Sequence, residues 1–173
     1  MDINYSKEMQ FALIEAKKAA GQYHAPYIGI EHVMLGVLKY PEATEMKDYL
    51  AVFKIETEGL QKKLEEILEA IDWENEEEPI DLKYNIQTEN TLRHAYLISK
   101  EQRSKTVEAV HFVLAVLKDN RTANYNSIKM ILRNAGMTYD ALLAETEDPM
   151  DDEMEKQLSD SQDDDDDDRV FKG

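Results

Sequence analysis

Two histidines recur at the same place in two similar segments of this chain, and an imidazole can bind a metal ion or transfer protons. His32 lies in YIGIEHVMLGVLK, residues 27–39, and His111 lies in TVEAVHFVLAVLK, residues 106–118. Each histidine is flanked by apolar residues at helical spacing. A polar side chain buried between helices is normally satisfied by hydrogen bonds within the protein. We therefore interpret His32 and His111 as structural residues, rather than as metal ligands or acid–base groups.

The segment EAVH, residues 108–111, has the Glu-x-x-His spacing of di-iron helical bundles. Such centres need this motif on two helices, together with further glutamates. The corresponding segment GIEH, residues 29–32, lacks the spacing, and the chain has no cysteine for a thiolate site or a cysteine nucleophile. We therefore expect that this chain binds neither a metal nor a cofactor.

The two histidine segments belong to a longer internal repeat. At a constant offset of 79 residues, the chain aligns with itself without a gap from Tyr5 to Lys39 and gives eight identical pairs, which include Leu13/Leu92 and His32/His111. Beyond Lys39 the second copy has three extra residues and the similarity is weaker. A single consistent offset indicates an old tandem duplication.

Each copy has the periodicity of four helices. Ser6 and Asn85 are suitable N-caps for the first helix of each copy, and Pro41 ends the second helix of the first copy. The remaining helices are expected at about 31–39, 43–53 and 57–71 in the first copy, and at about 107–117, 127–134 and 138–146 in the second. No segment alternates as a strand does. The sequence predicts an all-α fold of two four-helix repeats related by a pseudo-twofold axis.

The net charge of −17 is concentrated towards the C-terminal end. Residues 145–173 hold 14 acidic and 3 basic side chains, including six consecutive aspartates at 163–168. Such a segment buries too little apolar surface to offset its ordering entropy. We therefore expect a folded domain over 1–146, with repeats at about 3–71 and 85–146 and a connector at 72–84, followed by a disordered acidic linker or tail over 147–173.

Composition also limits the compartment and the partners. No apolar run approaches the roughly 20 residues that cross a bilayer, and residues 1–30 lack a signal-peptide pattern. We expect a cytoplasmic protein that does not bind a membrane. The acidic charge argues against nucleic-acid binding, which needs clustered Lys and Arg.

The repeated pattern resembles the Clp N domain, the substrate- and adaptor-binding domain of the ClpA, ClpB and ClpC unfoldases. The resemblance covers about residues 3–146 and rests on Tyr5-Ser6 at a helix start and on YIG-x-EH at the start of the next helix. Among these relatives, the chain is most similar to ClpC. The chain departs from the family pattern at Ile30, at Ala25-Pro26, at Asn85 and at Glu108-Ala109-Val110-His111, where only the histidine is kept.

The resemblance implies a non-catalytic domain that selects proteins for unfolding and degradation. In full-length relatives two ATPase modules follow, and a Clp peptidase is reached only through them. The chain contains no G-x-x-x-x-G-K-[ST] phosphate loop, so we expect no ATPase activity from this segment. The expected partners are protein substrates and adaptors, and the isolated domain is expected to be a monomer.

The resemblance also implies a candidate site. Some ClpC relatives use the carboxylate at the position of Glu31 to hold a guanidinium group, including phosphorylated arginine, beside the start of the first helix. By this resemblance Tyr5, Ser6 and Glu31 would form one such site. The second repeat has Val110 in place of the acidic residue, so any such recognition is expected at one site only.

A groove for a peptide or an adaptor would use exposed aromatic side chains, because these are good interface anchors. The candidates for this groove are Tyr23, Tyr27, Tyr40, Tyr49 and Phe53. Packing in the core or at its boundary is the other interpretation of the same residues. Two functions of other classes also remain open: a free-standing acidic helical adaptor or competitor without ATPase modules, and an enzyme or metal protein built on a helical bundle.

Overall fold

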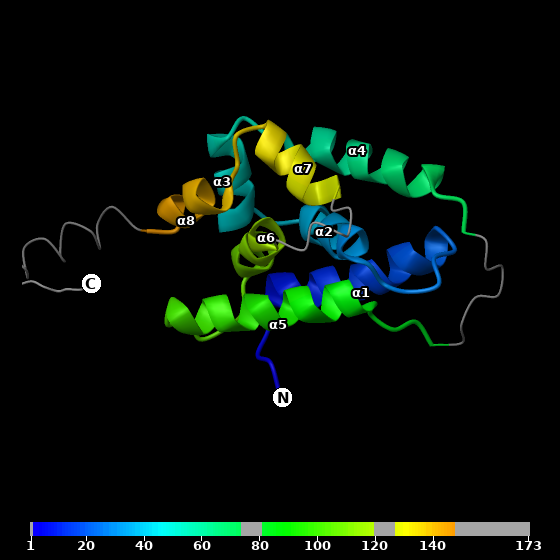
Figure 1. Ribbon diagram of the computed structural model, residues 1–173, viewed down its shortest axis with the longest axis horizontal. Coiled ribbons are helices and arrows are strands. Elements are labelled where there is room, and N and C mark those ends of the chain that lie inside the picture. The colour runs from blue at the N-terminus through cyan, green and yellow to red at the C-terminus, as the bar shows by residue number, and fades with distance from the viewer. Residues whose placement is uncertain (1, 74–80, 120–126, 148–173) are drawn as a thin grey trace, which may run out of the picture. The chain divides into compact units, whose positions relative to one another are not determined.

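The computed structural model describes residues 2–73, 81–119 and 127–147, so the predicted tail lies outside the described residues apart from Glu147. The described residues form eight helices and no sheet, which confirms the all-α class (Figure 1). The helices are α1 Lys7–Gln22, α2 Ile30–Lys39, α3 Glu45–Val52, α4 Thr57–Ala70, α5 Ile86–Glu101, α6 Ala109–Lys118, α7 Ser127–Asn134 and α8 Tyr139–Glu145. No helix in this part of the chain is long and apolar enough to cross a membrane.

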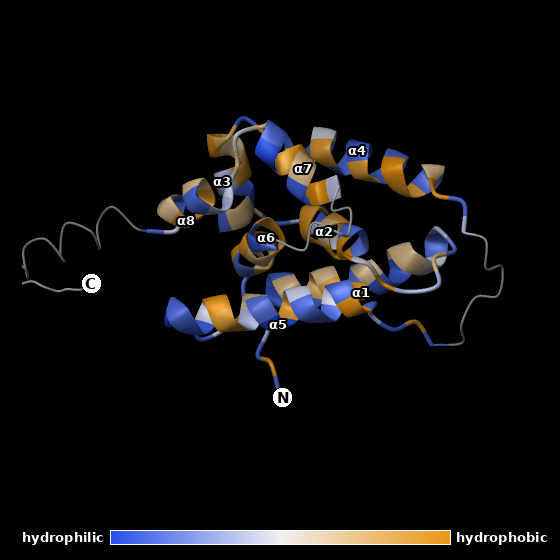
Figure 2. Ribbon diagram, viewed as in Figure 1, coloured by the Kyte–Doolittle hydropathy of each residue, from blue (hydrophilic) through white to orange (hydrophobic). Residues whose placement is uncertain are grey.

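The described residues fall into two compact units, of which the first ends at Tyr139. In the first unit, α2 and α6 lie between α1 and α5 on one side and α3, α4 and α7 on the other (Figure 1). Both central helices are apolar almost all round (Figure 2) and are buried along nearly their whole length. In the second unit, the described helix is α8, in which Leu142 is buried.

The helix starts follow from local capping. The side chains of Ser6 and Asn85 accept hydrogen bonds from the backbone N–H groups of Met9 (3.2 Å) and Thr88 (2.8 Å). Thr44 caps α3 in the same way, which is why this helix begins at Glu45 and not at the predicted residue 43.

The two repeats have the same turns as well as the same helices. After α1, His24 has φ 59°, and after α5, the equivalent Arg103 has φ 58°. Lys54 after α3 and Gly136 after α7 also have positive φ. The internal repeat inferred from the sequence is therefore also visible in the backbone conformation of these turns.

Small residues bring α1 and α2 close together. A Cβ atom on Gly36 of α2 would lie 2.3 Å from the carbonyl oxygen of Ala12 in α1. Ala16, Ala19 and Ala20 are also buried on α1. The second repeat has Ala115 at the position equivalent to Gly36, so α6 accommodates a methyl group where α2 accommodates only hydrogen.

The segment before the first helix of each repeat is hydrogen-bonded to the segment before the second helix of the other repeat. Ser6 N donates to Val107 O (3.1 Å) and Val107 N donates to Asn4 O (2.8 Å). The equivalent bonds join Asn85 N to Ile28 O (3.2 Å) and Ile28 N to Lys83 O (2.8 Å). We call these two places the α1–α6 crossing (residues 4–6 and 106–108) and the α5–α2 crossing (residues 27–29 and 83–85). Because Val107 takes part in a crossing, α6 begins at Ala109 and not at the predicted 107.

Candidate functional site

The two recurring histidines close the first turns of their own helices. His32 Nδ1 accepts a hydrogen bond from Gly29 N (2.9 Å), and His111 Nδ1 accepts one from Glu108 N (2.8 Å). A ring nitrogen that accepts carries no proton, so in the neutral ring the proton is on Nε2. Each histidine therefore accepts the hydrogen bond of the N-cap backbone N–H group, as the residue at the third helical position of a capping box does.

The second ring nitrogen distinguishes the two histidines. His111 Nε2 lies 3.0 Å from Gln102 Oε1 and can donate to it. His32 Nε2 is buried without a hydrogen-bond partner among the described residues. Burial lowers the pKa of His32 to about 4, and burial also lowers the pKa of His111, against the opposing effect of Glu108. Both rings are therefore neutral at pH 7.

No metal centre is formed by the part of the chain that the structure describes. Within it, no three His, Asp or Glu side chains lie together in a way that could hold an ion.

The two helix starts of the predicted guanidinium site lie at different crossings. Tyr5 and Ser6 are at the α1–α6 crossing, where they meet residues of the second repeat. Glu31 is in the first turn of α2, beside the α5–α2 crossing, so the helix start next to it is that of α5. Burial raises the pKa of Tyr5 to about 12, and Tyr84, which pairs with Ile28 at the other crossing, raises it further.

Glu31 is half-buried and has polar neighbours. Its carboxylate is hydrogen-bonded by its own backbone N–H group and by the side chain of Ser127 at the start of α7. Burial nevertheless raises the pKa of Glu31. Burial raises the pKa of the nearby Tyr27 hydroxyl, and the charge of Glu31 raises it further. A cation would therefore find a desolvated carboxylate here, already fixed in place by α2 and α7.

The α1–α6 crossing also has carboxylates, which the sequence comparison missed because they do not occupy the position of Glu31. Glu8 comes from α1 and Glu108 is the N-cap of α6. Burial is the largest cause of the raised pKa of Glu8, and Glu108 raises it further. Thr106 donates a hydrogen bond to Glu108. The replacement of an acidic residue by Val110 thus leaves this crossing acidic.

The aromatic groove candidates are spread over different parts of the first unit. Tyr40 packs edge-on against Phe11 of α1, with the ring centroids 5.3 Å apart, and Phe53 is the C-cap of α3. Tyr49 is half-buried on α3. Tyr23 and Tyr27 lie on either side of the turn that follows α1. Of this last pair, Tyr23 lines a cavity and Tyr27 contacts Trp73, another residue of its lining.

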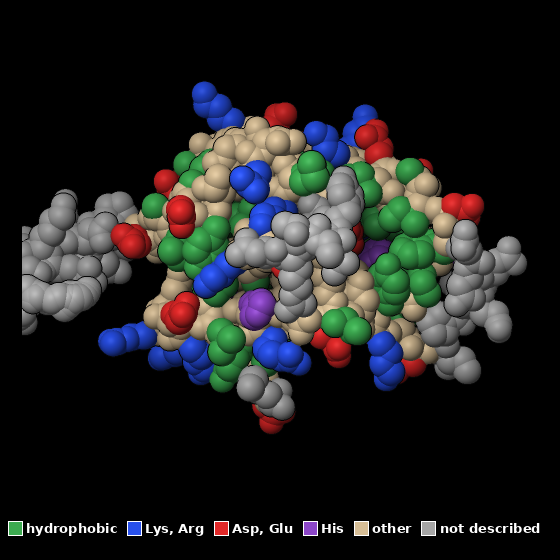
Figure 3. Space-filling model, in the orientation of Figure 1, with side chains coloured by type: hydrophobic (Ala, Val, Ile, Leu, Met, Phe, Trp, Pro, Cys, Tyr) green, Lys and Arg blue, Asp and Glu red, His purple; other side chains and the backbone are tan. Residues whose placement is uncertain are grey.

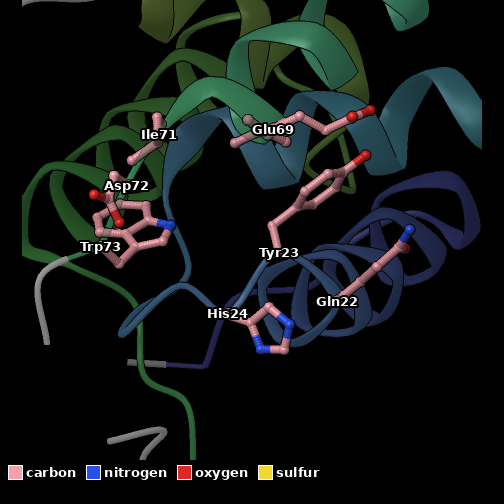
Figure 4. Close-up of a pocket in the computed structure, with 8 residues that line it drawn as sticks. Gln22, Tyr23, His24, Glu69, Ile71, Asp72 and Trp73 are labelled. Atoms are coloured by element: carbon pink, nitrogen blue, oxygen red, sulfur yellow. The ribbon is translucent and has the colours of Figure 1, made fainter. Parts of the chain in front are cut away.

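The cavity lies where α1 and α4 end, and its volume is about 470 Å³. Tyr23 and His24 approach it from the end of α1, while Glu69 and Trp73 approach it from the end of α4 and the residues after it (Figure 4). Tyr27 makes an edge-on contact with Trp73, with a centroid distance of 5.3 Å and an interplanar angle of 83°.

The comparison with known families decides what kind of domain this is. Residues 4–125 match the Clp repeat (R) N-terminal domain, and this range covers more than half of the chain. The chain belongs to the Clp repeat family. No curated protein sequence is significantly similar to it.

Solved structures show the same Clp N-domain fold. The Hsp104 N-terminal domain from Candida albicans is 21% identical, with 80% of this chain and 86% of that chain covered and a TM-score of 0.64. The N-domain of ClpV from Vibrio cholerae is 18% identical, with 80% of each chain covered and the same TM-score of 0.64. A further structure, which contains a peptide from the EAEC T6SS Sci1 SciI protein, is 16% identical, covers 82% and 85%, and has a TM-score of 0.63.

Sequence reasoning found part of this Clp N domain's polar and aromatic surface and missed the rest. It singled out Tyr23 and Tyr27 but not Trp73, Glu69 or Asp72, which line or border the same cavity. The signal that could have found them is the single tryptophan of the chain, two residues beyond the predicted end of the helix at 57–71.

Proposed function

We propose that this chain is the substrate- and adaptor-recognition N domain of a Clp-type AAA+ unfoldase and has no catalytic activity of its own. The observation that carries the proposal is the Clp repeat match over residues 4–125, together with the fold shared with the N-domains of Hsp104 and ClpV. In this proposal the domain binds a protein partner and presents it to an ATPase ring, and a Clp peptidase is reached only through that ring.

Protein partners are the class of ligand that the family supports. The similar solved structure that contains a SciI peptide supports a protein ligand. The proposed cellular setting is the cytoplasm, with neither a nucleic acid nor a membrane as partner. The proposal needs no cofactor in this segment.

A second part of the proposal concerns guanidinium or phosphoarginine recognition at Glu31. The carboxylate would hold the guanidinium group, and a helix N-terminus would hold the phosphate. Because Glu31 lies beside the start of α5, the helix end that serves it is the one capped by Asn85. Tyr5 and Ser6 would act from the neighbouring crossing. The variant Glu31→Gln tests this part, because it keeps the shape of the side chain and removes its charge.

Binding to an unfolded protein tests the recognition role directly. We expect a fluorescently labelled protein that is kept unfolded by chemical modification to show a saturable rise in anisotropy when this domain is added, and the same protein in its unmodified, native form to show none. Equal signals for the unfolded and native forms, or no saturable signal, would contradict the proposal.

The mass of the native polypeptide distinguishes the proposed role from that of a free-standing adaptor or competitor. An antibody against this domain should detect a band several-fold heavier than 20.0 kDa in the source cell. A band near 20.0 kDa would favour the free-standing adaptor and would exclude the ATPase connection.

A further inference from the structure

The cavity between the ends of α1 and α4 has a strongly one-sided electrostatic environment. Two helices terminate at it, and neither has a basic residue in its last turn. The carbonyl groups at a helix C-terminus carry a partial negative charge that a cation normally offsets. Here both negative ends point to the same place without such a cation on their own last turns.

Acidic side chains add to this negative environment. Glu69 of α4 and Asp72, which follows α4, line the cavity, and no Lys or Arg is among the described residues that line it. Burial raises the pKa of the Tyr23 hydroxyl, and the charges of Glu65 and Glu69 raise it further. The hydroxyl thus lies in a negative field, which is the condition that attracts a cation.

The walls of the cavity are aromatic. Trp73 and Tyr23 face the space from different sides (Figure 4). The ring of Tyr27 makes an edge-on contact with Trp73. Hydrophobic side chains also gather at this end of the surface in Figure 3. Aromatic faces attract cations and pack against the alkyl part of a Lys or Arg side chain.

The second repeat shows that the turn after α1 does not require an aromatic residue at the position of Tyr23. The same turn follows α5, with nearly the same φ, 58° at Arg103 against 59° at His24. There the chain has Gln102 in place of Tyr23, and Lys100 lies in the last turn of the helix. The tyrosine at position 23 is therefore not a consequence of the turn itself.

We propose that this cavity, lined by Tyr23, Glu69, Asp72 and Trp73, binds a Lys or Arg side chain of a protein partner. The assignment rests on the proposed function in that the ligand is part of a protein. It adds a basic anchor residue as a determinant of which proteins the domain selects. Arginine is expected to bind more tightly than lysine, because its planar guanidinium group stacks on aromatic rings.

Trp73 is the only tryptophan of the chain, so its fluorescence reports on the cavity directly. The probes are two end-blocked Gly-Ser peptides that differ at one residue, arginine in the first and its neutral isostere citrulline in the second. We expect a saturable change in emission with the arginine peptide and a dissociation constant about fivefold or more below that of the citrulline peptide. Equal responses to the two peptides would overturn the proposal.

Charge variants test the same site without removing the reporter. The double variant Glu69→Gln with Asp72→Asn should weaken binding of the arginine peptide by about fivefold and leave the citrulline peptide unaffected. The matched control is Glu101→Gln, which removes an exposed carboxylate at the end of the equivalent helix α5 and should change neither. If Glu101→Gln weakens binding as much as the cavity variants do, general acidity and not the cavity is responsible.

The unfolded-protein assay separates failure of this inference from failure of the proposed function. A domain that binds the unfolded protein but does not distinguish arginine from citrulline keeps the function and loses the cavity assignment. A domain that distinguishes the peptides and does not bind the unfolded protein supports the cavity and contradicts the broader recognition role.

Discussion

His32 and His111 have the same hydrogen bond at Nδ1 and different surroundings at Nε2. His32 is 1% exposed and its Nε2 is without a partner among the described residues, whereas Nε2 of His111 has Gln102 within reach. Protonation of His32 would therefore place a charge in an apolar environment and remove the acceptor for Gly29 N. The residue stabilises the fold only while its ring is neutral.

This gives a pH dependence with a defined sign. The pKa of His32 is about 4 in the folded chain, against an ordinary value of 6.5. Between these values the unfolded chain binds a proton that the folded chain does not, so the free energy of unfolding falls as the pH is lowered from 6.5 towards 4. The loss attributable to His32 is about 3 kcal/mol at most.

The variant His32→Gln isolates this effect. Glutamine is the usual residue at the third position of a capping box, so it keeps an acceptor for Gly29 N and does not titrate. Urea unfolding at pH 7 and pH 4.5 should show a smaller acid loss in His32→Gln than in the parent chain. The control is the same substitution at the exposed His94. If His32→Gln loses as much unfolding free energy between pH 7 and pH 4.5 as the parent chain does, other groups are responsible for the effect.

At the scale of elements, the helices are the part of the fold that the sequence predicts well. Caps such as Ser6 and Asn85 act within four residues, so a local pattern is enough to place them. The crossings join residues about 100 and 55 positions apart, such as Ser6 with Val107 and Ile28 with Asn85, and no local pattern encodes them. For this reason sequence reasoning placed Ser6 and Glu31 together, whereas the structure places them at separate crossings.

The residues of the candidate cavity also could not be brought together by a local sequence pattern. Tyr23 is recognisable as an aromatic residue after a helix, but its neighbourhood with Glu69 and Trp73 depends on α1 and α4 ending at the same place. A repeat alignment does not contain that information, because the second repeat has different residues at the equivalent turn.

The contact between α1 and α2 gives a prediction at this scale. Gly36→Ala should lower the free energy of unfolding by about 1–3 kcal/mol, because the new methyl group would lie 2.3 Å from the Ala12 carbonyl and force the helices apart. Urea unfolding followed by circular dichroism measures the change. The matched control is Gly59→Ala on the exposed side of α4, where the nearest atom is 3.8 Å away and helix propensity predicts a gain of about 0.5–1 kcal/mol. A neutral Gly36→Ala would mean that α1 and α2 can shift without cost.

At the scale of the whole molecule, neither repeat is complete without the other. The residues that lead into each repeat's first helix form backbone hydrogen bonds with the residue two positions before the second helix of the other repeat. The central helices α2 and α6 also contact each other. Cooperative folding should therefore require both repeats.

Fragments test this requirement. A fragment of residues 1–80 should have less helix than its share of the intact chain and should unfold without a sharp transition, because its crossings lack partners and α2 loses the cover of α5 and α6. Mixing it with a fragment of residues 81–147 should restore helix content and cooperativity, as measured by circular dichroism. A fragment 1–80 that unfolds cooperatively alone would show that the crossings contribute little.

The reciprocity of the crossings also has a consequence for ancestry. Asn4–Ser6 bonds to Val107 as Lys83–Asn85 bonds to Ile28, and these are the same positions in the two copies. This is the isologous pattern of a twofold homodimer, in which one surface meets a second example of itself. A single ancestral copy could therefore have formed a homodimer with a second molecule of the same protein. On this view, gene duplication would have joined two partners that were already able to assemble.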